Sequence, residues 1–167
     1  MNSKEMLGHH VRLHVSQSAM ETSRIVVGVD GSPGSHRALA WALQEGARRQ
    51  SMVDIVTVVP SEGERSSTPT DPETTLADAV ASAQGLAPDS APPMCTQVAT
   101  GTPADVLTRL AADADMLVVA SHATTGIRRE ALGSTSEWCT RFANCPVVVI
   151  PKAFDPTTRR RPSPPLT

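Results

Sequence analysis

Aromatic side chains are scarce in this sequence: there is no tyrosine, and tryptophan and phenylalanine together account for 2% of the residues. Hydrophobic residues nevertheless make up 40%, which is enough for a core. That core must therefore consist of valine, leucine, isoleucine and alanine, as in a parallel sheet covered by alanine-rich helices. The length of 167 residues suits one domain of α/β size.

The sequence also has few cysteines, a small net charge and no long apolar run, and each of these features argues against a class of protein. Cys95, Cys139 and Cys145 form neither a C-x-x-C motif nor a His/Cys cluster, so we expect buried thiols in a reducing compartment and no metal cluster; a disulfide or redox role is the less favoured alternative. A net charge of −2 provides no bulk attraction to nucleic acid or membranes. No apolar run approaches the roughly 20 residues of a membrane span, and the first residues lack the apolar region of a signal peptide. We therefore expect a cytoplasmic protein.

Short apolar strands alternate with helices along the chain. Short runs, most of them rich in valine, predict strands at 24–30, 53–59, 94–100, 116–120 and 147–150, of which 94–100 is the weakest. The helices between them are predicted to have Ser35, Thr75, Thr102 and Ser134 as N-caps. The last helix is expected to carry Trp138, Cys139 and Phe142 on one side. This alternation predicts parallel strands, right-handed crossovers and helices on both faces of one sheet.

Both ends of the chain lack apolar periodicity. Residues 1–23 are therefore predicted to be a disordered tail, and Met20 is interpreted as an alternative start of translation. Residues 152–167, which include three consecutive arginines and several prolines, are predicted to be a second disordered tail. A single domain is thus expected over residues 24–151.

The stretch from Asp115 to Ile150 carries the most specific pattern. Its first strand leads through a polar loop to Gly133-Ser134, where Ser134 and Glu137 match the S-x-x-E capping box of a helix start. A glycine at a helix start, after a loop that leaves a parallel strand, is a place where backbone N–H groups and the helix dipole hold anions. Cys145-Pro146-Val147 then begins the final strand.

This stretch resembles the C-terminal half of a universal stress protein domain. In that family a strand is followed by G-x-x-G, nine residues, G-S or G-T, a helix and a C-P-V strand. Here the later motifs are present at the right spacing, but Ala120 and Ala123 occupy the places of the two leading glycines. The resemblance covers residues 24–151 and implies a Rossmann-like fold of the adenine nucleotide alpha hydrolase type. Its sheet is a doubly wound, five-stranded parallel sheet of order 3-2-1-4-5.

A sheet of that order reverses its winding between strands 1 and 4, and ligands bind at the carboxyl ends of the strands at such a point. The loops expected there are 30–34 and 121–133. The resemblance implies that Asp30 contacts the adenosine part of a nucleotide and that Val58 lies beside adenine. The residues it implies as contacts of ATP or a related adenine nucleotide are Gly28, Asp30, Val58, Ala120, Ser121, His122, Ala123, Gly126, Gly133, Ser134 and Thr135.

Several of these residues also have a purely structural interpretation. Asp30 could cap a turn, Gly28 could allow close packing, Val58 is a core residue in either case, and Ser134 could serve only as an N-cap. The convergence of the set on one crevice favours the functional interpretation. Left-handed backbone at Ala120 and Ala123 would cost roughly 1 kcal/mol each, so we expect binding that is weakened roughly ten- to a hundredfold.

The sequence and the resemblance leave two functions open. The first is a nucleotide-binding stress module that holds ATP as a bound signal. The second is a nucleotide-independent module that acts through an unidentified protein partner. The family commonly pairs through its last strand, which implies a homodimer through residues 147–150. An enzyme is the third choice, because G-x-S-x-G, the P-loop and the S-G-G-x-D-S loop of ATP pyrophosphatases are absent, which leaves at most slow ATP hydrolysis.

Overall fold

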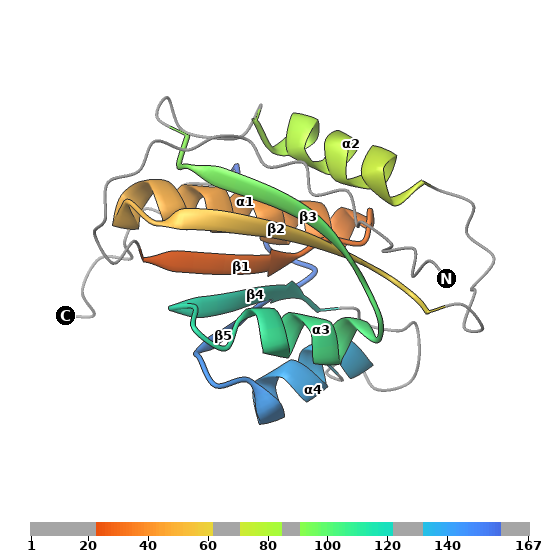
Figure 1. Cartoon of the computed structure of the whole chain (residues 1–167). Coiled ribbons are helices and arrows are strands. Elements are labelled where there is room, and N and C mark those ends of the chain that lie inside the picture. Colours follow the sequence, from red (N-terminus) through yellow and green to blue (C-terminus); the bar gives the residue numbers. More distant parts are fainter. Residues whose placement is uncertain (1–22, 62–70, 85–90, 122–131, 158–167) are drawn as a thin grey trace, which may run out of the picture.

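The computed structural model describes residues 23–61, 71–84, 91–121 and 132–157. Within these residues, strands and helices alternate along the chain (Figure 1). The elements are β1 (Arg24–Gly28), α1 (Pro33–Arg49), β2 (Met52–Val59), α2 (Pro72–Gln84), β3 (Met94–Thr100), α3 (Pro103–Leu110), β4 (Met116–Ala120), α4 (Ser134–Phe142) and β5 (Val147–Ile150). The predicted bounds of β3, β4 and β5 are confirmed, whereas β1 ends at Gly28 rather than at residue 30.

The strands of the described sheet are all parallel and lie in the order β3-β2-β1-β4-β5, which confirms the predicted topology (Figure 1). β1 lies in the middle, where Val27 pairs with Ile55 of β2 on one side and with Val118 of β4 on the other. The chain winds one way from β1 to β3 and the other way from β4 to β5. The connections that follow β1 and β4 therefore leave the sheet on opposite faces.

Each face of the sheet has its own aliphatic core. The helices α1 and α2 cover one face, and α3 and α4 cover the other. Successive residues of β1 belong to different cores, since Ile25 and Val27 face α1 while Val26 faces α3. The fully buried side chains are almost all valine, leucine, isoleucine and alanine, as the composition predicts.

Two helices begin earlier than predicted because a proline occupies their first position. α1 starts at Pro33, and the hydroxyl of Ser32 accepts a hydrogen bond from the Ser35 N–H at 3.1 Å, so Ser32 rather than Ser35 is the N-cap. α2 starts at Pro72, and Asp71 rather than Thr75 accepts from the Thr74 N–H at 3.1 Å. Proline is favoured at this position, since its missing N–H would have no partner there.

The aromatic residues of α4 are on its exposed side, contrary to the prediction that they share a side with Cys139. Trp138 and Phe142 are 45% and 55% exposed, and their ring centroids lie 4.3 Å apart. The buried residues of the helix are Ser136 and Cys139. Small side chains face the sheet here because α4 also packs against α3, which leaves little room for indole or phenyl rings.

The packed part of the chain continues beyond β5. Phe154 is partly buried against the core under α1, and the side-chain amide of Gln44 donates to the Pro156 carbonyl at 3.0 Å. Phe154 and Pro156, which lie in the segment predicted to be a disordered tail, thus contact the domain. Residues 1–22 and 158–167 lie outside the described residues.

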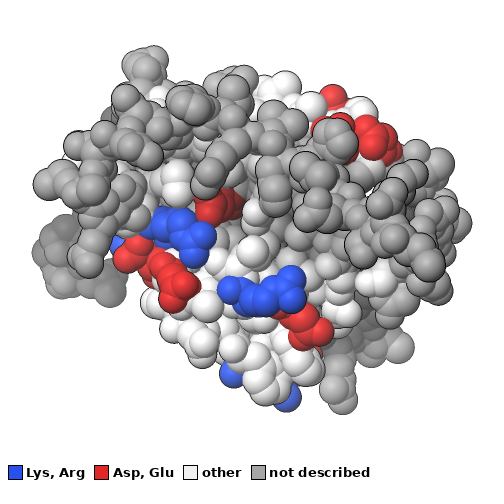
Figure 2. Space-filling model, viewed as in Figure 1, with Lys and Arg blue, Asp and Glu red and all other residues white. Residues whose placement is uncertain are grey.

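Charges of both signs are mixed on the described surface. On the face shown in Figure 2, basic and acidic side chains lie next to one another over the described elements. Two ion pairs illustrate this mixing: Arg24 with Asp54 at 3.0 Å, and Arg141 with Glu137 at 2.8 Å. None of the helices in the described part of the chain is long and apolar enough to cross a membrane.

We predict that Phe154→Ala lowers the free energy of unfolding by about 2 kcal/mol, roughly half the cost of truncating a fully buried phenylalanine. The melting temperature should fall by about 4–8 °C in a domain of this size. Lys152→Ala, at an exposed neighbouring position, is the matched control and should melt like the unmodified chain. Equal melting temperatures for the two variants would show that Phe154 adds nothing to the core.

Candidate functional site

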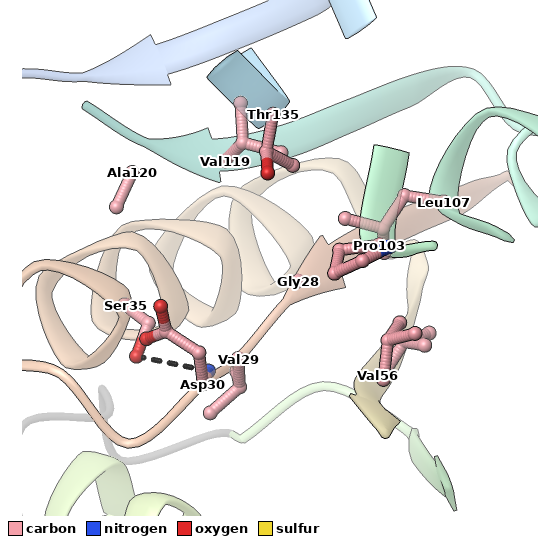
Figure 3. A pocket seen from close by; sticks show the side chains of 11 residues that line it. Gly28, Val29, Asp30, Ser35, Val56, Pro103, Leu107, Val119, Ala120 and Thr135 are labelled. Carbon is pink, nitrogen blue, oxygen red and sulfur yellow. Dashed lines mark hydrogen bonds between the residues drawn. The ribbon is translucent and has the colours of Figure 1, made fainter. Parts of the chain in front are cut away.

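A cleft of about 90 Å³ opens at the carboxyl ends of β1, β2 and β4 (Figure 3). Its lining comes from both sequence halves, with α1, α3 and α4 each contributing residues. The lining residues are Gly28, Val29, Asp30, Ser35, Val56, Val58, Pro103, Leu107, Val119, Ala120 and Thr135. This is the place where the winding of the sheet reverses, so the crevice lies where the predicted topology puts it.

Asp30 is an exposed residue of the cleft lining and lies two positions after the end of β1. Its carboxylate accepts a hydrogen bond from the Ser32 N–H at 3.0 Å, which forms an Asx turn around Gly31. Gly31 has a φ of +79°, a conformation that favours glycine. The Asp30 N–H donates to the Ser35 hydroxyl at 3.3 Å (Figure 3). Asp30 therefore does cap the turn, and the same hydrogen bonds hold its carboxylate at the cleft.

The start of α4 provides the second polar wall. Gly133 is its N-cap with φ −64° and ψ 157°, and no side chain of the described residues forms a cap hydrogen bond there. The predicted capping box is wrong: Ser134 lies inside the helix, and Glu137 pairs with Arg141 instead. Thr135 lines the cleft from the first turn. The N–H groups of this turn and the helix dipole thus provide an anion-binding end beside a hydroxyl group.

The remaining walls are apolar and close together. Val56 and Val58 reach the cleft from β2, and Pro103 and Leu107 reach it from α3. Figure 3 shows Val56, Pro103 and Leu107 on these walls. A Cβ atom added to Gly28 would lie 2.8 Å from Leu107 Cδ1, so the absence of a side chain there lets α3 approach β1. The close-packing interpretation of Gly28 is therefore correct, and the glycine also leaves backbone exposed to the cleft.

Ala120 does not have the strained backbone that the glycine motif suggests. It is the last residue of β4 and pairs with Ile150, and among the described non-glycine residues only Gln50 has a positive φ. Its methyl group faces the start of α1, where a Cβ added to Gly34 would lie 3.2 Å away. The predicted left-handed cost at Ala120 is wrong, because pairing with β5 keeps this residue extended. The alanine affects the cleft only through its methyl group.

The structure brings together a core of the predicted site residues and adds others. Gly28, Asp30, Val58, Ala120 and Thr135 line the cleft, whereas Ser121, Gly133 and Ser134 are described but are not part of its lining. His122, Ala123 and Gly126 lie outside the described residues.

Sequence reasoning missed a second set of lining residues: Val29, Ser35, Val56, Pro103, Leu107 and Val119. Two signals could have identified part of this set. Val56 lies two positions from Val58 on the same face of a strand. Pro103 begins the helix directly after β3, at the same end of the sheet.

The polar side chains in the described lining of the cleft are those of Asp30, Ser35 and Thr135. Burial, together with the nearby Cys145 thiol, raises the pKa of Cys139 to about 11, so that this thiol behind the cleft stays protonated at neutral pH. Within the described ranges, no three His, Cys, Asp or Glu side chains are grouped as metal ligands. The groups that can contact a ligand here are a carboxylate, a hydroxyl, a helix N-terminus and an apolar wall.

Comparison with known sequences finds one family. The profile of the universal stress protein family matches residues 21–151. A universal stress protein of Mycobacterium tuberculosis is 33% identical over 132 residues, which cover 75% of this chain and 44% of that protein. The chain thus spans less than half the length of the curated relatives it matches.

Comparison with solved structures finds the same fold. A universal stress protein in complex with cAMP is 28% identical, with a TM-score of 0.62, and the match covers 77% of this chain and 95% of that one. A universal stress protein from Archaeoglobus fulgidus in complex with dAMP is 25% identical, with a TM-score of 0.60, over 78% of this chain and 98% of that one. Both of these proteins were solved with an adenine nucleotide.

We predict that Ala120→Gly destabilises the fold by about 0.5–1 kcal/mol, the usual cost of glycine in a strand, because it relieves no strain. Ala99→Gly in β3 is the matched control and should cost about the same. Denaturant unfolding of both variants measures the two values. A stabilised Ala120→Gly beside a destabilised Ala99→Gly would show that residue 120 is strained after all.

Proposed function

The chain belongs to the universal stress protein family, and we propose that it binds an adenine nucleotide at the carboxyl end of β1 as part of a stress response. One observation carries the proposal: a helix start that no described side chain caps, a fixed carboxylate and an apolar wall meet in a single cleft. These groups match the three parts of a nucleotide. The relatives solved with cAMP and dAMP support the same ligand class.

Each part of the ligand has a partner of suitable chemistry. The adenine ring packs against Val58 and Pro103, two apolar lining residues that keep exposed surface, and burial of that surface favours binding. Asp30 accepts hydrogen bonds from the N–H or O–H groups of the adenosine part. The phosphate lies at the start of α4, where backbone N–H groups and Thr135 donate to it.

The size of the cleft limits the affinity. Its volume of about 90 Å³ corresponds to roughly three water molecules, whereas ligand pockets begin at about 300 Å³. The described walls therefore enclose only part of the nucleotide. Binding is weak, and the nucleotide acts as a bound signal rather than as a substrate of rapid turnover.

A second candidate function is a homodimeric module that acts through protein contacts. The observation in its favour is the edge strand β5, where Val147, Val148 and Val149 are only partly buried in the single chain. The carbonyl groups of Pro146 and Ile150 accept hydrogen bonds from Leu117 and Ser121 on the β4 side. The backbone groups of Val147 and Val149 thus point away from β4, toward a second copy of the strand.

For the nucleotide, calorimetry with ATP is expected to give a dissociation constant of tens of micromolar, about −6 kcal/mol. Asp30→Asn keeps the oxygen that caps the turn but removes the charge, and Thr135→Val removes the hydroxyl. Each should weaken binding about threefold to tenfold, the value of one hydrogen bond to a charged or polar ligand group. Thr140→Val, later on the same helix and exposed, should bind like the unmodified chain.

The absence of heat at millimolar ATP would refute nucleotide binding and favour the protein-contact function. Binding that none of the cleft variants changes would place the nucleotide elsewhere on the molecule.

For assembly, we expect light scattering to give the mass of a dimer at micromolar concentration. Val149→Pro removes one outward N–H while leaving the hydrogen bonds to β4, so this variant should be folded and monomeric. Circular dichroism reports the fold of the variant. A monomeric mass for the unmodified chain would exclude the homodimer.

A further inference from the structure

A second and larger cleft lies on the other face of the sheet, between the starts of α1 and α2. Its volume is about 490 Å³, within the range of roughly 300–1,000 Å³ that is typical of ligand pockets. The lining residues are Asp30, Gly31, Ser32, His36, Thr57, Pro72, Thr75 and Asp78. Asp30 is the one residue that the two described clefts share.

The wall of this cleft holds two buried polar atoms without partners among the described residues. Thr57 is 5% exposed, and its hydroxyl makes no hydrogen bond. The Nε2 atom of His36 is buried and equally unpartnered. Thr57 lies between Val56 and Val58 in β2, whose side chains face the first cleft, so the alternation of the strand turns Thr57 toward the second.

Buried polar groups in folded proteins are nearly always hydrogen-bonded, because an unmade bond costs the desolvation of the group. A valine at position 57 would have nearly the same shape without that cost. The hydroxyl and the imidazole nitrogen therefore indicate a ligand, and the chemistry of the other lining residues indicates its class.

We propose that the second cleft binds a small hydroxylated amine. The carboxylates of Asp30 and Asp78 line the cleft and attract an ammonium group, whereas Thr57, Thr75 and His36 offer hydrogen bonds to hydroxyl groups. An anion is disfavoured for two reasons. The two carboxylates repel it, and the adjacent helix starts are already capped by Ser32 and Asp71.

The test uses three probes that share one carbon chain: glucamine, which carries an ammonium group, neutral sorbitol, and sorbitol phosphate. Amide NMR spectra of the full chain are recorded during titration with each probe. Glucamine should shift the amide signals of His36, Thr57 and Thr75. Sorbitol should bind about tenfold more weakly, since it lacks the charged hydrogen bond. Sorbitol phosphate should leave these signals unchanged.

Two variants and a control connect the shifts to this cleft. Thr57→Val should reduce glucamine affinity at least fivefold while the melting temperature stays equal or rises, because an unpaired hydroxyl is removed. Asp78→Asn should weaken glucamine binding and bring its affinity closer to that of sorbitol, because one of the two carboxylates is removed. Thr108→Val removes a hydroxyl that bonds within α3, and should bind glucamine like the unmodified chain.

Three results would overturn the proposal. The first is the absence of glucamine shifts at His36 and Thr57. The second is unchanged glucamine binding by Thr57→Val, which would mean that the Thr57 hydroxyl makes no hydrogen bond to the ligand. The third is tighter binding of sorbitol phosphate than of glucamine. None of these results depends on ATP binding in the first cleft, so the nucleotide proposal stands or falls separately.

Discussion

The parallel pairing of β1 with β2 on one side and β4 on the other is the contact on which both clefts depend. Because β4 follows three other strands in the chain, this pairing makes the winding of the sheet reverse beside β1. The chain leaving β1 turns to one face and the chain leaving β4 turns to the other. A gap at the carboxyl end of β1 is the geometric result, and the two clefts lie on either side of the turn that crosses it.

Small residues at this end of the sheet keep the gap open and the layers close. The absence of a side chain at Gly28 allows Leu107 of α3 to approach β1, and its absence at Gly34 allows α1 to approach Ala120. The Asx turn of Asp30 and the N-cap of Ser32 then fix the first residues of α1. The site is thus held by backbone geometry and local hydrogen bonds more than by long side chains, in keeping with a sequence so poor in aromatic residues.

The fold could be predicted from the sequence because the strands are short, mostly valine-rich and separated by strong turn residues. The bounds of β4 and β5 were predictable for this reason. β3 contains a single valine and was the weakest of the predicted strands, although its predicted bounds are correct. Helix starts were harder, since serine and threonine occur at several neighbouring positions and proline decides among them, as at Pro33 and Pro72. The burial of α4 was also not predictable: Trp138 and Phe142 have the hydrophobicity of core residues, but close packing of α4 on α3 favours Cys139.

For the candidate site, positions that a motif fixes were predictable, and positions that only the packing of layers brings together were not. Asp30 and Thr135 belong to the first kind, whereas Leu107 enters the cleft from a helix that shows no sign of it in the sequence. The cost assigned to Ala120 was wrong because a motif glycine does not reveal whether its backbone is left-handed or extended. Only the pairing with Ile150 decides that.

The position of Asp30 between the two clefts has a thermodynamic consequence. One carboxylate has a limited number of acceptor sites, and the Ser32 N–H already uses one of them. Ligands on opposite faces of the sheet that both bind to this carboxylate would compete for its acceptor sites and would oppose each other's binding. Such antagonism is reciprocal: the factor by which a ligand in one cleft weakens the other must be the same in both directions. A single side chain would thereby make each cleft a sensor of the other's occupancy without any movement of the sheet.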